Sequence, residues 1–320
     1  MRRILVTGAL GQIGSELVPA LAARHGPDRV IASDIRMRPV TAGAADVSYA
    51  HLDCTRPPQL QEAVRRNDVG AIYHLAAVLS AIAEEKPQVA WNVNMDGLYN
   101  VLEIARQYDC AVFFPSSIGA FGPTTPHDLT PQDTIQRPTT MYGVTKVAGE
   151  LLCDYYALRF GVDARGLRLP GLISHSAPPG GGTTDYAVEI FHQAVRYRHY
   201  TCFLRRDTRL DMMYMPDAVA GMIKLMEAGP CRLDHRNAFN VTAMSFTPDE
   251  LAQAIRAHIP DFVIDYQVDP VRQAIADSWP RSLDDSAARK EWDWAPSYDL
   301  PAMTRDMIES LRKRAGVGGP

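Results

Sequence analysis

The sequence predicts an α/β protein in which a doubly wound parallel sheet is followed by a smaller, discontinuous C-terminal lobe. Three observations predict this fold class. Short runs of branched apolar residues alternate with helical patterns to about residue 167, an order typical of parallel sheets with helices on both faces. A glycine-rich turn joins the first of these runs to a helical pattern. Beyond Pro170 the alternation loosens, and proline and glycine crowd residues 170–182.

The strands of the first part are predicted from short apolar runs, because a strand covered on both faces needs no polar side. They cover residues 3–7, 29–33, 47–52, 71–75, 111–116 and 163–168. Apolar spacing of about 3.6 residues predicts the helices between them. These cover residues 12–25, 58–67, 87–108 and 141–160.

The second part is predicted to be a lobe of fewer and looser elements. The patterns indicate a helix at 185–200, a strand turning into a helix at 212–228, and helices at 247–259 and 299–314 around a strand at 262–268. We therefore expect one domain formed by residues 1–169 and about 211–239. Residues about 170–210 and 240–314 form the expected substrate lobe, and 315–320 a frayed tail.

The composition is that of an ordinary globular chain of 320 residues, with 22% charged and 46% hydrophobic residues. A net charge of −4 gives no reason to expect nucleic acid or an anionic membrane as a partner. No apolar run approaches the ~20 residues that span a bilayer. Five scattered cysteines show neither a disulfide framework nor metal-ligand spacing, so we expect free thiols in a reducing cytoplasm and no metal. The basic segment 196–209 is expected to be solvated or ion-paired, with anion binding as the alternative.

The glycine-rich turn has the spacing of a dinucleotide-binding fingerprint. Gly8, Gly11 and Gly14 fall in the segment GALGQIG, after a predicted strand and before a helical pattern. Glycine at these positions permits a tight turn, a close approach of backbone to a pyrophosphate, and close packing of helix on strand. The free N–H groups of the helix N-terminus then face the phosphates. This context predicts a Rossmann-type domain.

An acid at the end of the second predicted strand indicates which dinucleotide binds. Asp34 stands where a carboxylate accepts hydrogen bonds from the ribose 2′-hydroxyl and repels a 2′-phosphate. We therefore expect NAD, although Arg36 and Arg38 could pair with a phosphate instead. Asp53, at the next strand end, is placed to contact the adenine edge. The predicted cofactor contacts of this half are Gly8, Gly11, Gln12, Ile13, Gly14, Asp34, Asp53, Leu75, Ala76 and Ala77.

Tyr142 and Lys146 lie four residues apart in a helical pattern, so their side chains share one face. A free tyrosine loses its proton only near pH ~10, but a fixed ammonium group nearby favours the phenolate. Tyr142 could then act as a base nearer neutrality, and the hydroxyl of Ser117 could hold the oxygen of a substrate alcohol or carbonyl. This set is equipment for hydride transfer to or from a nicotinamide. A packed tyrosine beside a solvated lysine is the structural alternative.

With these pieces in order, the first half resembles an extended short-chain dehydrogenase/reductase. The matching segments are GALGQIG at 8–14, Asp34, Leu52-Asp53, residues 74–77, residues 115–117 with Phe121-Gly122, and residues 142–146. The resemblance implies that Tyr142 is the acid/base, and that Lys146 lowers its pKa while binding the nicotinamide ribose. It also implies that Ser117 orients the reacting oxygen, with Ser116 the weaker candidate. Leu169, Tyr142 and Lys146 complete the implied cofactor contacts.

The second half resembles the short-chain type of L-threonine 3-dehydrogenase, on the segments LRLPGLIS at 167–174 and PPGGGTTDYA at 178–187. This implies NAD-dependent oxidation of the 3-hydroxyl of L-threonine to 2-amino-3-oxobutyrate, in threonine catabolism. It also implies a homodimer through the helices near 87–108 and 141–160. The predicted substrate contacts are Ser80, Ser117, Tyr142, Gly181, Thr183 and Thr184, with Asp185 and Asp211 as candidate partners of the ammonium group.

Two alternatives stay open. A nucleotide-sugar epimerase or dehydratase uses the same serine, tyrosine and lysine with NAD kept bound, but such enzymes usually carry asparagine where Gly171 stands. A non-catalytic dinucleotide sensor would bind NAD without turnover, and such proteins generally lack the tyrosine–lysine pair.

Overall fold

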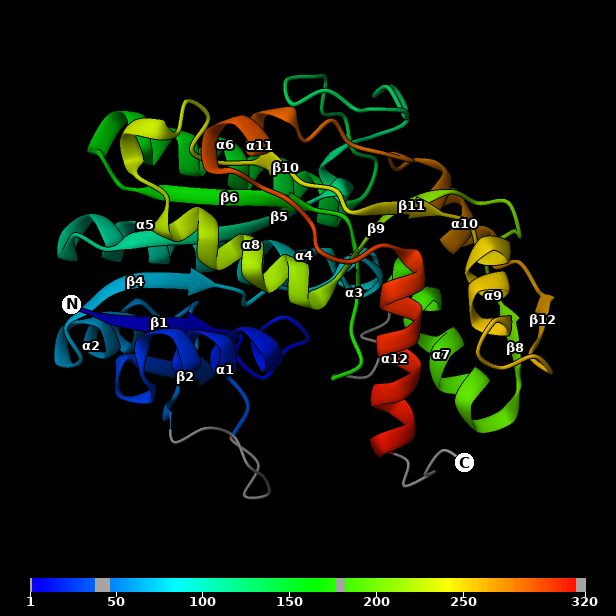
Figure 1. Cartoon of the computed structure of the whole chain (residues 1–320). Helices are drawn as coiled ribbons and strands as arrows, with labels where there is room; N and C mark the ends of the chain where they lie inside the picture. The colour runs from blue at the N-terminus through cyan, green and yellow to red at the C-terminus, as the bar shows by residue number, and fades with distance from the viewer. Residues whose placement is uncertain (1, 38–46, 177–181, 315–320) are drawn as a thin grey trace.

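The computed structural model describes residues 2–37, 47–176 and 182–314. A large sheet with helices on both faces forms one side of the molecule, and a lobe of helices and short strands stands beside it (Figure 1). Within the described residues, no helix is long and apolar enough to cross a membrane.

The central sheet has seven strands, and every neighbouring pair in it is parallel. In spatial order the strands are β10 (Phe239–Asn240), β6 (Ala164–Leu169), β5 (Ala111–Ser117), β4 (Val69–His74), β1 (Arg3–Thr7), β2 (Val30–Asp34) and β3 (Ser48–His51). The chain order reverses between β1 and β4. In open α/β sheets, ligands bind at the carboxyl ends of the strands beside such a reversal.

Helices cover the two faces of this sheet, because alternate strand residues point to opposite sides. On one face, Ile4 and Val6 of β1 pack in a core with the helices α1 (Gly14–His25), α8 (Met215–Glu227) and α11 (Ser286–Trp292). On the other face, Leu5 packs in a core with α2 (Pro57–Arg66), α5 (Gly97–Tyr108) and α6 (Met141–Phe160). The polar ends of the strands are left at the edge where the glycine-rich turn lies.

The segment predicted as one helix at 87–108 is divided. It consists of α4 (Pro87–Trp91), a π-helical turn (Asn92–Asp96) and α5. Inside the π turn, the side-chain oxygen of Asn94 accepts from the N–H of Val78 at 2.8 Å, and its amide nitrogen donates to the hydroxyl of Thr145 at 3.1 Å. The wider turn therefore links the loop after β4 to the helix that carries Tyr142.

The C-terminal lobe contains two small sheets and its own core. The strands β7 (Gly171–Ile173), β9 (Leu210–Tyr214) and β11 (Met244–Phe246) form one sheet, and β8 (His199–Cys202) pairs with β12 (Val263–Tyr266). The helices are α7 (Tyr186–Tyr197), α9 (Pro248–Arg256), α10 (Pro270–Asp277) and α12 (Leu300–Arg314). Tyr186, Phe191 and Met307 are fully or almost fully buried in this core.

Several predicted bounds need correction. The helix expected at 185–200 ends at Tyr197, because Arg198 adopts a left-handed conformation (φ 58°) and the chain continues as β8. The helix expected at 12–25 begins at Gly14, after the turn. The helices α3 (Ser80–Glu85), α10 and α11 and the strands β7, β8, β10 and β11 were not predicted, because each is short and held by distant packing. Short 3₁₀ turns cover Pro27–Arg29, Ile118–Ala120, Thr183–Asp185 and Pro230–Arg232.

Candidate active site

A pocket of about 220 Å³ opens at the carboxyl edge of the sheet, beside the reversal of strand order. Its walls come from the glycine-rich turn, the ends of β4, β5 and β6, the start of α6, and the C-terminal lobe. It gathers most of the predicted site residues, namely Gly8, Gly11, Gln12, Ile13, Gly14, Leu75, Ala77, Ser80, Ser117, Tyr142, Lys146, Leu169, Thr183 and Thr184. Asp34, Asp53 and Ala76 do not line it, and Gly181 lies outside the described residues.

The glycine-rich turn is packed so tightly that a side chain cannot replace the hydrogen at two of its positions. Gly8 has a φ of 68°, and a Cβ there would lie 2.7 Å from the backbone nitrogen of Ala76. A Cβ on Gly14 would lie 2.6 Å from the backbone of Ala9. Between them, the side-chain amide nitrogen of Gln12 is buried and has no hydrogen-bond partner. The backbone of the turn can therefore approach a ligand closely, and the amide of Gln12 can donate a hydrogen bond to it. Both features fit a bound dinucleotide.

Asp34 is an ionised acid beside this turn. Its carboxylate is buried and accepts from the N–H of Leu10 at 3.0 Å and from the guanidinium of Arg36 at 3.0 Å. Burial disfavours the charge, but the hydrogen bonds from Arg36 and Leu10 together hold the pKa of Asp34 below its ordinary value. Arg36 is therefore engaged by a carboxylate, whereas Arg38 lies outside the described residues.

Asp53 is held by its own loop. Its carboxylate accepts from the N–H and the hydroxyl of Thr55, at 2.9 and 2.7 Å, and lies 3.5 Å from the guanidinium of Arg56. These local contacts hold its pKa low, although burial works against them. The predicted contact of Asp53 with an adenine edge stays a prediction.

Tyr142 and Lys146 occupy the first two turns of α6, whose start is fixed by local packing. Thr140 caps the helix by accepting from the N–H of Gly143 at 3.1 Å. A Cβ on Gly143 would lie 2.3 Å from the carbonyl oxygen of Gly119. Only glycine lets the helix start approach the loop after β5 so closely, and this approach brings Tyr142 to the end of that strand.

Ser117, Tyr142 and Lys146 meet in the pocket. The hydroxyl of Ser117 accepts from the N–H of Gly119 at 3.1 Å and is hydrogen-bonded to Tyr142. The ammonium group of Lys146 donates to the carbonyl oxygen of Pro115 at 2.6 Å and lies 5.3 Å from the ring centre of Tyr142. The predicted catalytic residues are therefore assembled at one end of β5.

The electrostatics of this trio correct one expectation. Lys146 was expected to lower the pKa of Tyr142, but burial raises that pKa to about 12, and the hydrogen bond with Ser117 offsets only part of the effect. Burial also lowers the pKa of Lys146 to about 8, opposed by the charge of Glu150. Loss of water around both groups outweighs the attraction between an ammonium and a phenolate.

Adjacent serines on β5 point in different directions, as strand geometry requires. Ser117 faces Tyr142, whereas the buried hydroxyl of Ser116 donates to the carboxylate of Glu150. Ser117 is therefore better placed than Ser116 to touch a reacting oxygen.

Of the predicted substrate residues, Thr183 and Thr184 line the pocket from the C-terminal lobe, beside Gly182 and Asp185. Thr183 and Asp185 are buried, and the carboxylate of Asp185 accepts from the N–H of Gly182 at 2.7 Å. Ser80 begins α3 and is buried too. Asp211 is elsewhere: it is fully buried and accepts from the hydroxyl of Thr242 at 2.6 Å and the N–H of Leu283 at 3.0 Å. Asp211 is thus a structural acid and does not line this pocket.

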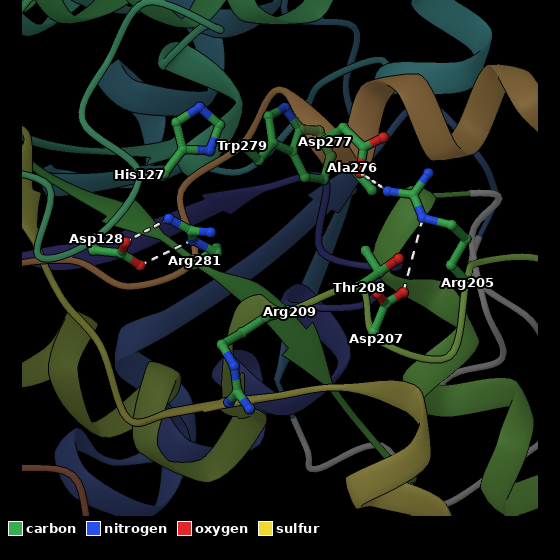
Figure 2. A pocket seen from close by; sticks show the side chains of 10 residues that line it. All are labelled: His127, Asp128, Arg205, Asp207, Thr208, Arg209, Ala276, Asp277, Trp279 and Arg281. Atoms are coloured by element: carbon green, nitrogen blue, oxygen red, sulfur yellow. Dashed lines mark hydrogen bonds and ion pairs between the residues drawn. The ribbon is translucent and has the colours of Figure 1, made fainter.

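Trp279 also lines the pocket and was not predicted. It follows α10, a short helix of the C-terminal lobe, so no local motif pointed to it. Trp279 lines a second, polar pocket of about 470 Å³ as well. Figure 2 shows this pocket, in which Arg281 faces Asp128 and Arg205 donates to Asp277 at 2.8 Å.

The basic segment is ion-paired where the structure describes its partners. Arg205 pairs with Asp277 at 2.8 Å, Arg206 with Asp249 at 3.1 Å, and Arg209 with Glu250 at 2.5 Å. Within the described ranges, no group of histidine, cysteine and acidic side chains could hold a metal ion.

Comparison with known proteins places this site in a family. The model of the NAD dependent epimerase/dehydratase family matches residues 4–242. The chain belongs to that family. An uncharacterized epimerase/dehydratase of Staphylococcus aureus is 53% identical to this chain over 317 residues, and the match covers 99% of each protein.

Solved structures resemble this family member along its whole length, which confirms the predicted fold class and resemblance. An L-threonine dehydrogenase from Clostridium difficile is 56% identical, covers 99% of both chains and superposes with a TM-score of 0.96. An L-threonine dehydrogenase from Cupriavidus necator, in its holo form, is 52% identical, covers 97% of this chain and 99% of its own, and has a TM-score of 0.93. A UDP-glucose 4-epimerase from Thermotoga maritima, at 22% identity and a TM-score of 0.85, shares the fold.

Proposed function

We propose that this protein oxidises the 3-hydroxyl of L-threonine to 2-amino-3-oxobutyrate with NAD⁺, as a step of threonine catabolism in the cytoplasm. One observation carries the proposal. Ser117, Tyr142 and Lys146 meet at a glycine-rich turn, in a chain that resembles solved L-threonine dehydrogenases over 97–99% of its length. Tyr142 would take the proton of the substrate hydroxyl, and NAD⁺, when bound, would accept the C3 hydride.

NAD fits the residues at the turn. Backbone from Gly8 to Gly14 and the unpartnered amide of Gln12 would hold the pyrophosphate, and the carboxylate of Asp34 would accept from the ribose. Leu75, Ala77 and Leu169 line the remaining wall. When bound, the nicotinamide supplies the hydride acceptor; orientation and charge placement belong to the protein.

Tyr142 is the proposed acid/base, with Ser117 holding the oxygen from which it takes the proton. Because the pKa of Tyr142 is raised to about 12, its hydroxyl carries a proton at neutral pH. Tyr142 must therefore release this proton to water before its oxygen accepts the proton of the substrate hydroxyl, and the hydrogen bond from Ser117 favours that release because it lowers the pKa of Tyr142. Lys146, with a pKa near 8, is largely charged at neutral pH and stabilises the negative charge that develops on the phenol oxygen.

Recognition of a small zwitterion is proposed at the wall formed by the C-terminal lobe. Thr183, Thr184 and Ser80 line the pocket, and their hydroxyls would bind the carboxylate. The carboxylate of Asp185 lines the same pocket, and its negative charge would attract the ammonium group. The loop hydroxyls thus discriminate an amino acid from an uncharged alcohol.

Gly171 argues against the alternative of a nucleotide-sugar epimerase or dehydratase. A Cβ at this position would lie 2.5 Å from the sulfur of Met212 and 2.7 Å from the Cγ2 of Thr184. An asparagine there would require the side chains of Met212 and Thr184 to move. The complete set of Ser117, Tyr142 and Lys146 argues likewise against a sensor without catalysis.

A homodimer is proposed through the outer faces of α5 and α6. Tyr99, Leu151, Tyr155 and Leu158 are exposed there, and Leu158 is 88% exposed. A second copy that covers these side chains would remove a contiguous apolar surface from water. A monomeric L-threonine 3-dehydrogenase is 46% identical to this chain, so a single chain is the alternative to the proposed homodimer.

Replacing the proposed acid/base tests the reaction class. Tyr142→Phe removes only the hydroxyl, and we expect kcat with L-threonine to fall at least about a hundredfold while NAD⁺ binding, followed by calorimetry, persists. Tyr155→Phe, on the same helix but exposed, is the matched control and should leave kcat unchanged. Turnover that survives Tyr142→Phe would remove Tyr142 from the mechanism.

A further inference from the structure

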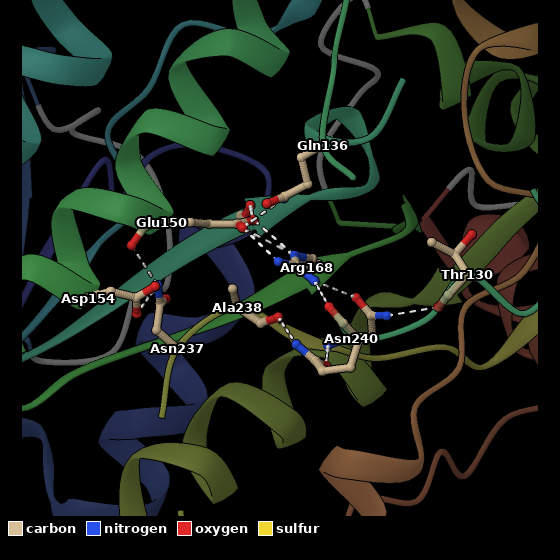
Figure 3. A network of polar contacts seen from close by, with 10 residues as sticks. Thr130, Gln136, Glu150, Asp154, Arg168, Asn237, Ala238 and Asn240 are labelled. Carbon is tan, nitrogen blue, oxygen red and sulfur yellow. Dashed lines mark hydrogen bonds and ion pairs between the residues drawn. The ribbon is translucent and has the colours of Figure 1, made fainter. Parts of the chain in front are cut away.

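A buried ion pair lies directly behind the catalytic trio. Glu150 follows Lys146 by one turn of α6, and Arg168 stands on β6; both are almost fully buried. The guanidinium of Arg168 donates to both carboxylate oxygens of Glu150, at 2.9, 3.1 and 3.2 Å. Figure 3 shows this pair at the centre of a wider polar network. The proposed reaction gives neither residue a part.

Glu150 also holds the strand end that carries the catalytic serine. The hydroxyl of Ser116 donates to its carboxylate, as does the side-chain amide of Gln136 at 2.8 Å. One turn earlier, Lys146 donates to the carbonyl oxygen of Pro115. Side chains from two successive turns of α6 are therefore hydrogen-bonded to Pro115 and Ser116, the two residues of β5 immediately before Ser117.

The same network extends to the C-terminal lobe. Arg168 donates to the carbonyl oxygen of Gln132 at 2.7 Å and to the side chain of Asn240 at 3.2 Å. The side-chain amide of Asn240 donates in turn to the carbonyl oxygen of Thr130 at 3.0 Å. The N–H of Thr130 donates to the carbonyl oxygen of Ser282 at 2.9 Å. Ser282 is three residues beyond Trp279 in the wall of the pocket. Glu150 is thus connected to both the catalytic and the substrate end of the site.

Besides the charge of Glu150, the ammonium group of Lys146 is stabilised by its hydrogen bond to the carbonyl oxygen of Pro115 and by two aromatic rings. Lys146 is surrounded by the rings of Phe114 and Tyr142, at 4.9 and 5.3 Å, and by His74 of β4 and Cys153 of α6. Burial lowers the pKa of His74 to about 3 and raises that of the Cys153 thiol, so both are uncharged at neutral pH.

The other charged groups of this region are in contact with Glu150 or follow it on the helix. Arg168 approaches the carboxylate from β6, and Asp154 lies one turn further along α6, where it accepts from Asn237 at 3.2 Å. Among these groups, the carboxylate of Glu150 is the one whose negative charge raises the pKa of Lys146, and it therefore favours the protonated amine.

We propose that Glu150 is a positioning residue for the reaction: its carboxylate stabilises the positive charge of Lys146 and fixes the end of β5 that presents Ser117. A buried ion pair in a purely structural role would hold the fold without affecting either group. The two roles make different predictions for Lys146. The kinetic part of this inference rests on the proposed dehydrogenase function.

The direct test is the titration of Lys146 itself. The chain has only five lysines, so carbon-13 labelling of their side chains gives few NMR signals, and Lys146→Met assigns the relevant one. Glu150→Gln keeps the size of the side chain and its acceptor oxygen but removes the charge. We expect the midpoint of Lys146 to fall by about one pH unit in this variant.

Asp154→Asn is the matched control, because it removes a carboxylate from the next turn of the same helix. We expect this variant to leave the midpoint of Lys146 unchanged. An unchanged midpoint in Glu150→Gln, or an equal shift in both variants, would overturn the proposal. If Glu150→Gln fails to fold, the titration of the unmodified protein still tests the proposal. A Lys146 side chain that is already neutral at pH 7 would overturn the proposal.

The kinetic readout is the pH profile of kcat/KM with L-threonine and NAD⁺. In Glu150→Gln the decline at alkaline pH should begin about one unit lower than in the unmodified protein, and it should not move in Asp154→Asn. A uniform loss at every pH, with the midpoint of Lys146 unmoved, would assign Glu150 a structural role only. Absence of turnover in the unmodified protein would instead reject the proposed function, while the NMR titration still tests the link between Glu150 and Lys146.

Discussion

Tyr142 and Lys146 show how burial sets the chemistry of single residues. Loss of contact with water raises the pKa of Tyr142 and lowers that of Lys146, so it favours the uncharged form of both side chains. Spacing along the chain predicted that the two would meet on one helix face. It could not predict the balance of charge, because the depth of burial depends on β4, β5 and the loop after them, which are distant in the sequence.

The buried ammonium group of Lys146 should make the protein less stable at neutral pH. Its folded pKa of about 8 lies below the ordinary value, so the unfolded chain binds the additional proton between roughly pH 8 and 10. Stability contributed at this site is therefore lowest below pH 8 and rises through that window. We expect Lys146→Met to raise the free energy of unfolding at pH 7 by roughly 2–3 kcal/mol. This difference from the unmodified protein should be smaller at pH 9.5.

Chemical denaturation at the two pH values measures this effect. Lys290→Met, at an exposed position, is the control and should change stability little at either pH. A Lys146→Met variant that is less stable than the unmodified protein at pH 7 would show that the lysine contributes more through its contacts than burial removes.

Asp34 is predicted to select the cofactor. Asp34→Ser removes the carboxylate that would repel a 2′-phosphate and frees Arg36, which it now binds at 3.0 Å. We expect the ratio of kcat/KM for NADP⁺ over NAD⁺ to rise on the order of tenfold, equivalent to about 1.4 kcal/mol. Asp53→Ser should leave the ratio as it is. If Asp34→Ser leaves the ratio of kcat/KM for NADP⁺ over NAD⁺ unchanged, the cofactor ribose does not bind beside Asp34.

At the scale of elements, the site depends on how closely the start of α6 meets the end of β5. The strands of the large sheet other than β10 were predicted close to their observed bounds, because apolar runs mark them locally, whereas the long helix predicted at 87–108 is divided by a π-helical turn. Trp279 and α11 were not predicted, since short elements gain their stability from packing: Trp292 at the end of α11 is buried in the core beside α8. The substrate end of the pocket was therefore the less predictable part.

Gly143→Ala tests this close approach. A Cβ there would lie 2.3 Å from the carbonyl oxygen of Gly119, so the start of α6 must shift and carry Tyr142 with it. Because misplacement by about 1 Å can cost about a hundredfold, we expect a loss of that order in kcat while NAD⁺ still binds. Gly229→Ala has nothing within 4 Å of the new Cβ and should be silent. Full activity in Gly143→Ala would mean that the contact can relax without moving Tyr142.

At the scale of the whole molecule, the sheet places the cofactor turn and the catalytic trio on one edge, and the second lobe closes the pocket with Thr183 and Trp279. The opposite, outer faces of α5 and α6 carry exposed apolar side chains. One surface serves chemistry, and we propose that the other serves assembly.

Leu158→Glu tests the proposed homodimer. Light scattering of the unmodified protein should give twice the chain mass of 35.4 kDa, and the substitution should reduce it to one chain, because a charge replaces a side chain that is 88% exposed in the single chain. Tyr197→Glu, an exposed position on α7, should stay dimeric. An unmodified protein with the mass of one chain would contradict the proposed assembly.

The most direct measurement of the central claim is NADH absorbance after mixing the protein, NAD⁺ and L-threonine, with D-threonine, L-allo-threonine, L-serine and UDP-glucose in parallel. We expect NADH formation that depends on L-threonine and exceeds that with every other compound. No NADH from L-threonine, in a protein that binds NAD⁺, would rule out the proposed reaction, and interconversion of the sugar nucleotide would then favour an epimerase.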